Sequence, residues 1–131
     1  MRTLGQKRAA FALEKVTTIS CDNPKEFKTF SAGAPSMILQ NGFGQALAFW
    51  YAKGGQNQRD KHRVLLDILQ EWLCLCNGDV RNRFIPPCTT PREMVTALAA
   101  MSQDQYLAAQ KEALALLEWI KRYANALLKG K

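Results

Sequence analysis

Positively charged side chains are the residues of this sequence best suited to bind a ligand, because they cluster and the chain carries a formal net charge of +7. Residues 1–65 hold ten Lys or Arg and four Asp or Glu, whereas residues 66–131 hold eight and seven. Such asymmetry favours a polyanionic partner. The candidate contacts to phosphate groups are Lys7, Arg8, Lys15, Arg59, Lys61, Arg63, Lys121 and Arg122.

Arg59, Lys61, His62 and Arg63 form the densest cluster, at the start of an expected helix where the macrodipole is already positive. Cations cost stability at that place, and Asp60 offsets only part of the cost. The same helix start offers unpaired backbone N–H groups to a phosphate. The cluster is therefore either a phosphate-binding site or a solvated surface.

The other candidates lie near the two ends of the chain. Arg8 and Lys15 share one face of the first expected helix, and Lys7 lies on the adjacent flank. Lys121 and Arg122 lie near the end of the last expected helix, where cations are favoured even without a ligand.

Catalytic and metal-binding patterns are missing from the sequence. His62 is the only histidine, and we find no nucleophile elbow, no His-Glu-x-x-His motif and no paired inward carboxylates. Cys74 and Cys76 would point about 200° apart on a helix, so they cannot share a metal there. We expect no enzyme activity, no cofactor and no metal. A thiol-dependent enzyme that uses Cys88 in a proline-rich loop is the remote alternative.

Two glycines, Gly42 and Gly44, flank Phe43 within a segment that otherwise reads as helix. Each costs about 1 kcal/mol in a helix interior. A dinucleotide-binding loop is not expected, because no strand precedes them. Close packing of a neighbour at Gly42 is the favoured explanation, and a break in the helix is the other.

Composition places the chain among folded globular proteins of one domain, residues 1–131, with 47% hydrophobic and 22% charged residues. No apolar run approaches the ~18 residues of a membrane span. The N-terminal segment is too charged for a secretory signal, so we expect a cytoplasmic protein.

The apolar periodicity is helical almost throughout and predicts an all-α compact bundle of about six helices with a long C-terminal helix. Helix-start signals occur at Asn23-Pro24, Thr90-Pro91 and Ser102. The expected helices are 3–20, 24–31, 35–53, 59–76, 90–101 and 102–128, with a loop at 78–89.

Three blocks of this pattern resemble one known family: "LGQKRAAFALEKV" at 4–16, "LQNGFGQALAFWYAKG" at 39–54 and "EALALLEWIKRYANALL" at 112–128. Together they resemble the small all-helical subunit of the type III-B CRISPR effector, the Cmr or RAMP-module complex. The Asn41-Gly42 element with Gln45 and Leu47 is the most specific part. Phe43 departs from the smaller aliphatic residue that the family leads one to expect.

The resemblance implies a non-catalytic structural subunit. Such subunits stack with copies of themselves beside backbone subunits, and guide RNA paired with target RNA lies between the two filaments and is contacted through its phosphates. On this interpretation the eight basic candidates are RNA-binding residues, chosen by charge placement alone. The alternative is a helical protein–protein adaptor that never touches nucleic acid.

Overall fold

The structure, a computed structural model, describes residues 3–75 and 84–128. These residues form six α-helices and one π-helical turn, without any strand. The all-α bundle with a long last helix is thus confirmed. The elements are α1 (Leu4–Thr17), α2 (Pro24–Asn41), α3 (Phe43–Gly54), α4 (Lys61–Gln70), the π-helical turn η1 (Glu71–Leu75), α5 (Pro91–Leu98) and α6 (Gln103–Leu127).

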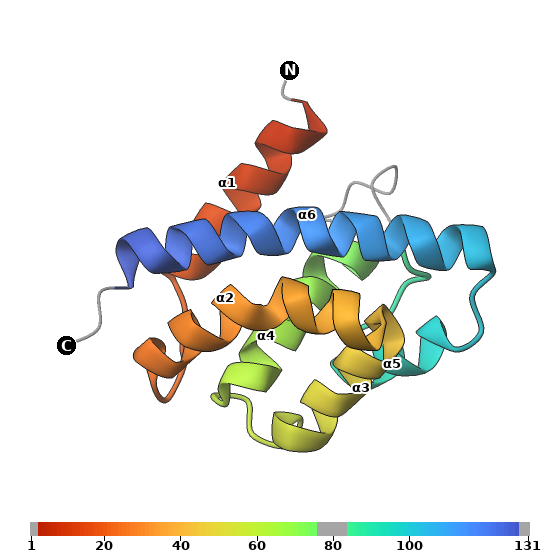
Figure 1. The fold of residues 1–131 in the computed structure, drawn as a ribbon, viewed down its shortest axis with the longest axis horizontal. Helices are drawn as coiled ribbons and strands as arrows, with labels where there is room; N and C mark the ends of the chain where they lie inside the picture. Colours follow the sequence, from red (N-terminus) through yellow and green to blue (C-terminus); the bar gives the residue numbers. More distant parts are fainter. Residues whose placement is uncertain (1–2, 76–83, 129–131) are drawn as a thin grey trace.

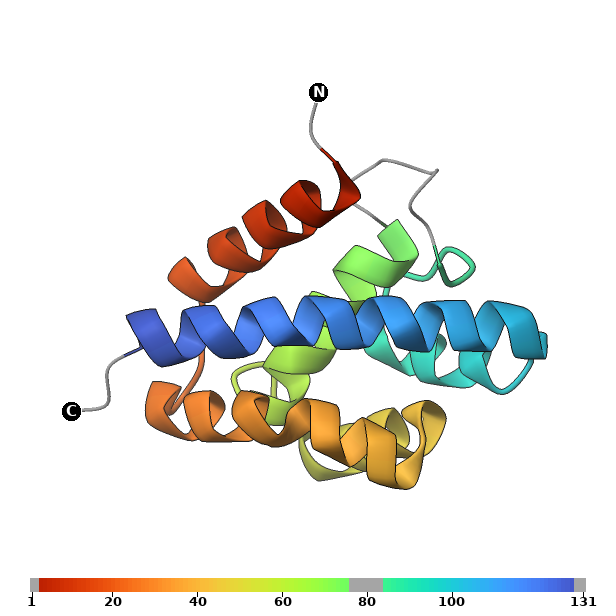
Figure 2. The same cartoon turned by 45° about the horizontal axis from the view of Figure 1, so that its top comes forward.

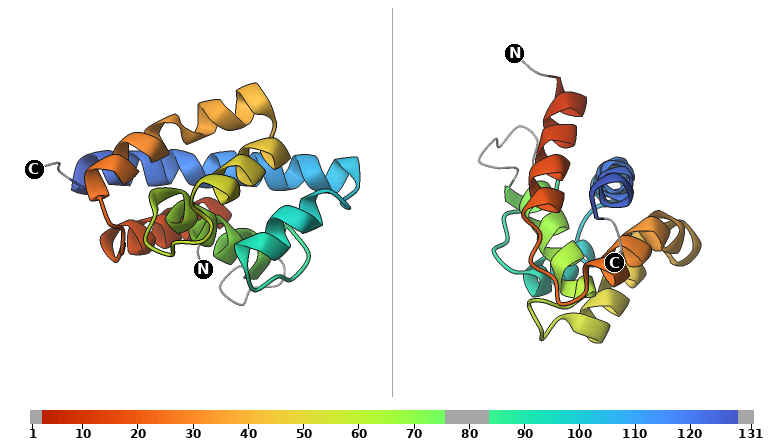
Figure 3. Two further views of the ribbon diagram at one scale, coloured as in Figure 1. Left: turned by 90° about the horizontal axis from the view of Figure 1, so that it is seen from below. Right: turned by 90° about the vertical axis from the view of Figure 1, so that its left-hand side faces the viewer.

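The long helix α6 runs across the molecule and packs against both α1 and α2 (Figure 1). Figure 2 shows α6 between these two helices, and the end-on view in Figure 3 shows them on either side of it. Helix α4 packs against α2, α3 and α5 and continues through η1 toward α6. Helices α1 and α2, from the first third of the sequence, therefore lie against α6, from its end. Side chains from the two ends of the chain can come close together along α6.

Helix starts are the part of the local structure that the sequence predicts best. At Asn23, Thr90 and Ser102 the side-chain oxygen accepts the backbone N–H three residues later, over 3.1, 3.2 and 3.3 Å. Pro24 and Pro91 occupy the first turn, where a missing N–H costs nothing. These caps confirm the expected starts of α2, α5 and α6.

The expected break between residues 31 and 35 is wrong. Helix α2 continues through Gly33 and Pro35 to Asn41. A proline inside a helix costs about 3 kcal/mol. Here Pro35 lies on the buried side of α2, and burial of that side opposes the cost. The buried stripe of α2 comprises Phe27, Ser31, Ala34, Pro35 and Ile38.

The chain instead turns at Gly42, so the break is the correct explanation there and close packing is not. Gly42 has φ +91° and ψ 150°, and a side chain at this position would meet nothing within 4 Å. Its N–H closes α2 on Ile38 and its C=O accepts from Ala46, which opens α3. Gly44 is the position of close approach, because its N–H donates to the Tyr106 hydroxyl at 2.7 Å.

Burial does not follow residue type at every position. Leu39 and Leu127, both apolar, are 68% and 48% exposed. Glu112, a charged residue, is buried in the seam of α6 at 5% exposure. Residues 84–90 are not helical, as expected of the loop, while residues 76–83 of the expected helix end and loop lie outside the described residues. No described helix has the length and apolarity that a membrane span requires.

Candidate nucleic-acid interface

Arg8 on α1 is bound to Glu112 on α6 by two hydrogen bonds of 2.7 Å, one from Nε and one from a terminal guanidinium nitrogen. The same carboxylate accepts the indole N–H of Trp72 at 2.8 Å. The hydrogen bonds to Glu112 raise the pKa of Arg8, although burial acts in the opposite direction. Arg8 therefore joins α1 to α6 and is removed from the candidate phosphate contacts.

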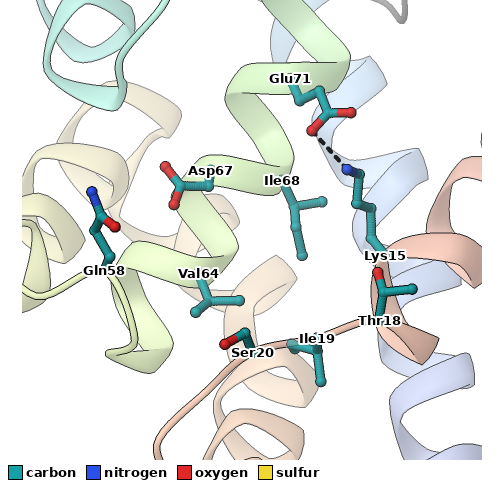
Figure 4. A pocket seen from close by; sticks show the side chains of 9 residues that line it. All are labelled: Lys15, Thr18, Ile19, Ser20, Gln58, Val64, Asp67, Ile68 and Glu71. Carbon is teal, nitrogen blue, oxygen red and sulfur yellow. Dashed lines mark ion pairs between the residues drawn. The ribbon is translucent and has the colours of Figure 1, made fainter.

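Lys15 is also paired within the protein. It lies beside a hollow of about 220 Å³ between the end of α1 and α4, where its side chain points toward Glu71 (Figure 4). The Lys15 Nζ is 2.7 Å from the Glu71 carboxylate, and Asp67 lines the same hollow. The Lys15 ammonium is already neutralised by the Glu71 carboxylate, so this hollow is a poor phosphate site.

Arg59 and Lys61 tie the start of α4 to the start of α2. Arg59 Nε lies 2.7 Å from Asp22, and Lys61 Nζ lies 3.4 Å from Glu26. The Arg59 side chain is 58% exposed, so water screens its pair. Each cation therefore has a structural role that the sequence did not reveal, and a carboxylate lies beside each of them.

Arg63 is more enclosed than Arg59 and Lys61. Its Nε contacts Asp67 at 2.9 Å, and a terminal nitrogen donates to the Gly55 carbonyl at 2.7 Å. The side chain is 19% exposed. Arg63 therefore joins α4 to the end of α3, and we remove it from the candidate contacts too.

His62 and Asp60 form the N-terminal cap of α4. Asp60 Oδ1 accepts the His62 backbone N–H at 2.8 Å and lies 2.8 Å from its ring Nδ1, while the ring packs on Phe30 with centroids 4.6 Å apart. Burial alone would raise the pKa of Asp60. The hydrogen bonds from His62 and the nearby positive charge of Lys61 outweigh burial and lower that pKa below its usual value.

Replacing Asp60 by Asn is expected to keep the cap, because Asn caps helices as well as Asp, and to remove a pH-dependent contribution to stability. The folded pKa lies below the unfolded value of about 3.9, so charged Asp60 stabilises the fold above that pH. The contribution is lost as the pH falls through the folded pKa. Urea denaturation between about pH 5 and pH 3 should show the unaltered chain losing its advantage over Asp60→Asn. If the free energy of unfolding changed equally with pH in the two proteins, the lowered pKa of Asp60 would be contradicted.

Lys121 and Arg122 on α6 are the candidates that the structure leaves most available. They line a groove of about 450 Å³ together with Lys28, Thr29 and Ala32 of α2. Among the described residues nothing pairs with Lys28 or Lys121, and Arg122 makes only a long 3.9 Å contact to Glu118 at 73% exposure. The groove thus gathers three cations and no carboxylate among its lining residues.

The helix macrodipole does not explain this pair of cations. Helix α6 ends at Leu127, and neither Lys121 nor Arg122 lies in its last turn, the only part where the dipole acts strongly. Lys28 was not among the candidates chosen from the sequence, because only the packing of α2 beside α6 brings it to Lys121. Lys7 lies half-buried on α1, away from this groove.

The whole described helical body matches one protein family. A family model described as CRISPR-associated protein (Cas_Cmr5) matches residues 4–127, from the first residue of α1 to the last residue of α6. The chain belongs to the Cmr5 family. A CRISPR system Cmr subunit Cmr5 from Thermus thermophilus is 31% identical over 129 residues, which is 98% of both chains.

A solved Cmr5-family structure has the same fold. The crystal structure of a CRISPR-associated Cmr5 family protein from Thermus thermophilus matches with a TM-score of 0.76 and 30% identity, over 98% of this chain and all of the other. The resemblance of the three sequence blocks to the small Cmr subunit is thereby confirmed.

The described residues give the Cys88 thiol no general base, which a thiol-dependent enzyme would need. Cys88 is 5% exposed, and burial raises the pKa of its thiol. Its Sγ lies 3.2 Å from the Cys74 Sγ and 3.0 Å from the Pro86 carbonyl oxygen, neither of which is a general base. Within residues 3–75 and 84–128 no three His, Cys, Asp or Glu are placed to hold a metal ion.

Proposed function

We propose that this chain is a structural, non-catalytic subunit of a CRISPR Cmr ribonucleoprotein. In this proposal it stacks with copies of itself beside the backbone subunits and contacts guide and target RNA through their phosphates. The Cmr5 family match and the relative named as a Cmr subunit support the assembly. We expect the complex to act in the cytoplasm, without a membrane partner.

The groove between α2 and α6 is the observation that carries the RNA part of the proposal. Lys28, Lys121 and Arg122 line it, and none of the described residues that line it is acidic. An RNA duplex offers proteins a phosphate backbone and a shallow minor groove, and recognition is mostly by shape and charge. Three cations on one groove suit contacts to neighbouring phosphates without reading sequence. Lys121 and Arg122 are therefore the first RNA contacts to test, whereas Lys7, Lys15, Arg59 and Lys61 are secondary.

Replacing Lys121 and Arg122 together by alanine is expected to weaken binding to an RNA duplex of arbitrary sequence. The slope of log K against log salt should fall in magnitude by about 2, one unit for each lost phosphate contact. Fluorescence polarisation of a labelled duplex, titrated with the full-length chain between about 50 and 200 mM salt, measures both quantities.

A variant of equal charge serves as the matched control. Arg92 on α5 and Lys111 on α6 are exposed and do not line the groove, so replacing both by alanine removes the same net charge elsewhere. The control should keep most of the affinity and salt slope of the unaltered chain. An equal loss in the two double variants would show that total charge, and not the groove, binds the RNA.

A protein–protein adaptor without nucleic-acid contact is the second candidate function. Leu39 on α2 and Phe49 on α3 are 68% and 50% exposed, so a partner protein could cover them. A partner protein that covers them would need no cation from the groove. This candidate predicts no salt-dependent binding of RNA by the unaltered chain.

A further inference from the structure

Two buried thiols face each other away from the cationic groove. Cys74 on η1 and Cys88, just before α5, have their Sγ atoms 3.2 Å apart. The two residues are 0% and 5% exposed. A disulfide has its sulfurs about 2.05 Å apart, so a shift of about 1 Å would be enough to join them.

Hydrogen bonds on both sides of the sulfur pair fix the positions of the two thiols. Phe84 and Ile85 donate their N–H groups to the Leu73 carbonyl at 2.9 and 3.1 Å. The Gln70 side-chain amide donates to the Cys88 carbonyl at 2.6 Å. The segment that carries Cys88 is thus fixed to the helix that carries Cys74 on both sides of the sulfur pair.

We propose that Cys74 and Cys88 are an oxidation site that forms a reversible intramolecular disulfide with a peroxide as oxidant. The Cys88 thiolate attacks one oxygen of hydrogen peroxide, so that an S–O bond forms and the O–O bond breaks. The hydroxide that leaves takes up the proton that the Cys88 thiol gave up, which gives a sulfenic acid and one water. The Cys74 thiolate then attacks the Cys88 sulfur, so that the S–S bond forms and the S–O bond breaks. The second hydroxide leaves as water with the proton from the Cys74 thiol. Two thiols and one peroxide yield one disulfide and two waters, so two electrons pass from sulfur to oxygen.

The environment of Cys88 makes this oxidation slow. Burial raises the pKa of the Cys88 thiol, and the negative charge of Glu93 adds to that effect, while the hydrogen bond to Cys74 acts against it. The nucleophile is the thiolate, so a raised pKa lowers the rate of the first step. The geometry favours the second step, because the resolving thiol is already in contact.

The disulfide would fasten the non-helical segment 84–90 to η1. It closes a loop of residues 74–88, and a loop of that length corresponds to a rise in Tm of about 10 °C on the chain-entropy estimate. The oxidised chain should therefore have a higher Tm than the reduced chain, and a thiol reductant should remove the difference.

The test uses the full-length chain with Cys76→Ala, so that the peptide carrying Cys74 has one thiol. After treatment with hydrogen peroxide, the mass should fall by that of two hydrogen atoms. Trypsin cleaves at arginines that leave Cys74 in peptide 64–81 and Cys88 in peptide 84–92. A non-reducing digest should contain these two peptides joined, and a thiol reductant should separate them.

Cys21 provides the matched control, since it is buried and its Sγ hydrogen-bonds to the Asn23 carbonyl oxygen, at 3.7 Å, and to no other described thiol. Cys21→Ala should leave the crosslink and the shift in Tm intact, whereas Cys88→Ala should abolish both. Oxidation of Cys88 to a sulfinic acid without a crosslink would overturn the proposal. So would the absence of the joined peptides in Cys76→Ala, because Cys74 and Cys88 would then form no crosslink.

Discussion

Arg8→Ala is expected to destabilise the fold by about 3 kcal/mol or more, because it leaves a buried carboxylate without its cation. Arg8 donates two 2.7 Å hydrogen bonds to Glu112, which is only 5% exposed and keeps Trp72 as its other donor. Removal of one partner of a buried pair costs far more than the pair contributes. Urea denaturation followed by circular dichroism gives the free energy of unfolding.

Arg122→Ala is the matched control, since it also deletes a guanidinium that faces a glutamate. In this case both residues lie on α6. Arg122 is 73% exposed and lies 3.9 Å from Glu118, so the loss should stay within about 0.5 kcal/mol. Replacing Arg8 and Glu112 together by leucine should recover much of the stability that Arg8→Ala loses. If Arg8→Ala and Arg122→Ala had equal effects, the Arg8–Glu112 pair would be a surface contact and not a link between α1 and α6.

The helix starts were predictable from the sequence because their signals are local. A cap, a first-turn proline and the residue three positions later lie within one turn, as at Asn23 and Thr90. A helix boundary was wrongly expected at residues 32–35, because a local signal there is overridden by packing. "AGAP" suggests a break, yet the stripe from Phe27 to Ile38 is buried through it, and the packing of α2 against α6 holds Pro35 within the helix.

The candidate site was harder to predict because a charge run shows where cations are in the sequence and not what faces them. Arg8 and its carboxylate partner are 104 residues apart, and Arg59 and its partner are 37 apart. No periodicity links such residues, so paired and unpaired cations look alike in the sequence. Lys121 and Arg122 were attributed to the end of the last helix. The expected range of that helix, 102–128, and its observed range, Gln103–Leu127, both place the two cations before its last turn.

Gly42→Ala is expected to destabilise the fold by about 2 kcal/mol, because Gly42 has φ +91° and ψ 150°, a region that residues with a Cβ rarely adopt. The cost comes from the backbone alone, since a Cβ at this position would meet no atom within 4 Å. The same turn closes α2 on Ile38 and opens α3 at Ala46, so no neighbouring residue can relieve it without breaking a helix end. Thermal and urea denaturation measure the loss.

Gly33→Ala separates this strain from the ordinary effect of adding a methyl group. Gly33 lies inside α2 and a Cβ there also meets nothing within 4 Å, so alanine should stabilise the helix by about 0.5–1 kcal/mol. The two substitutions have the same chemistry and opposite expected signs, because one glycine is helical and the other is not. Destabilisation by Gly33→Ala with tolerance of Gly42→Ala would place the break near residue 33, as the sequence first suggested, and would contradict a continuous α2.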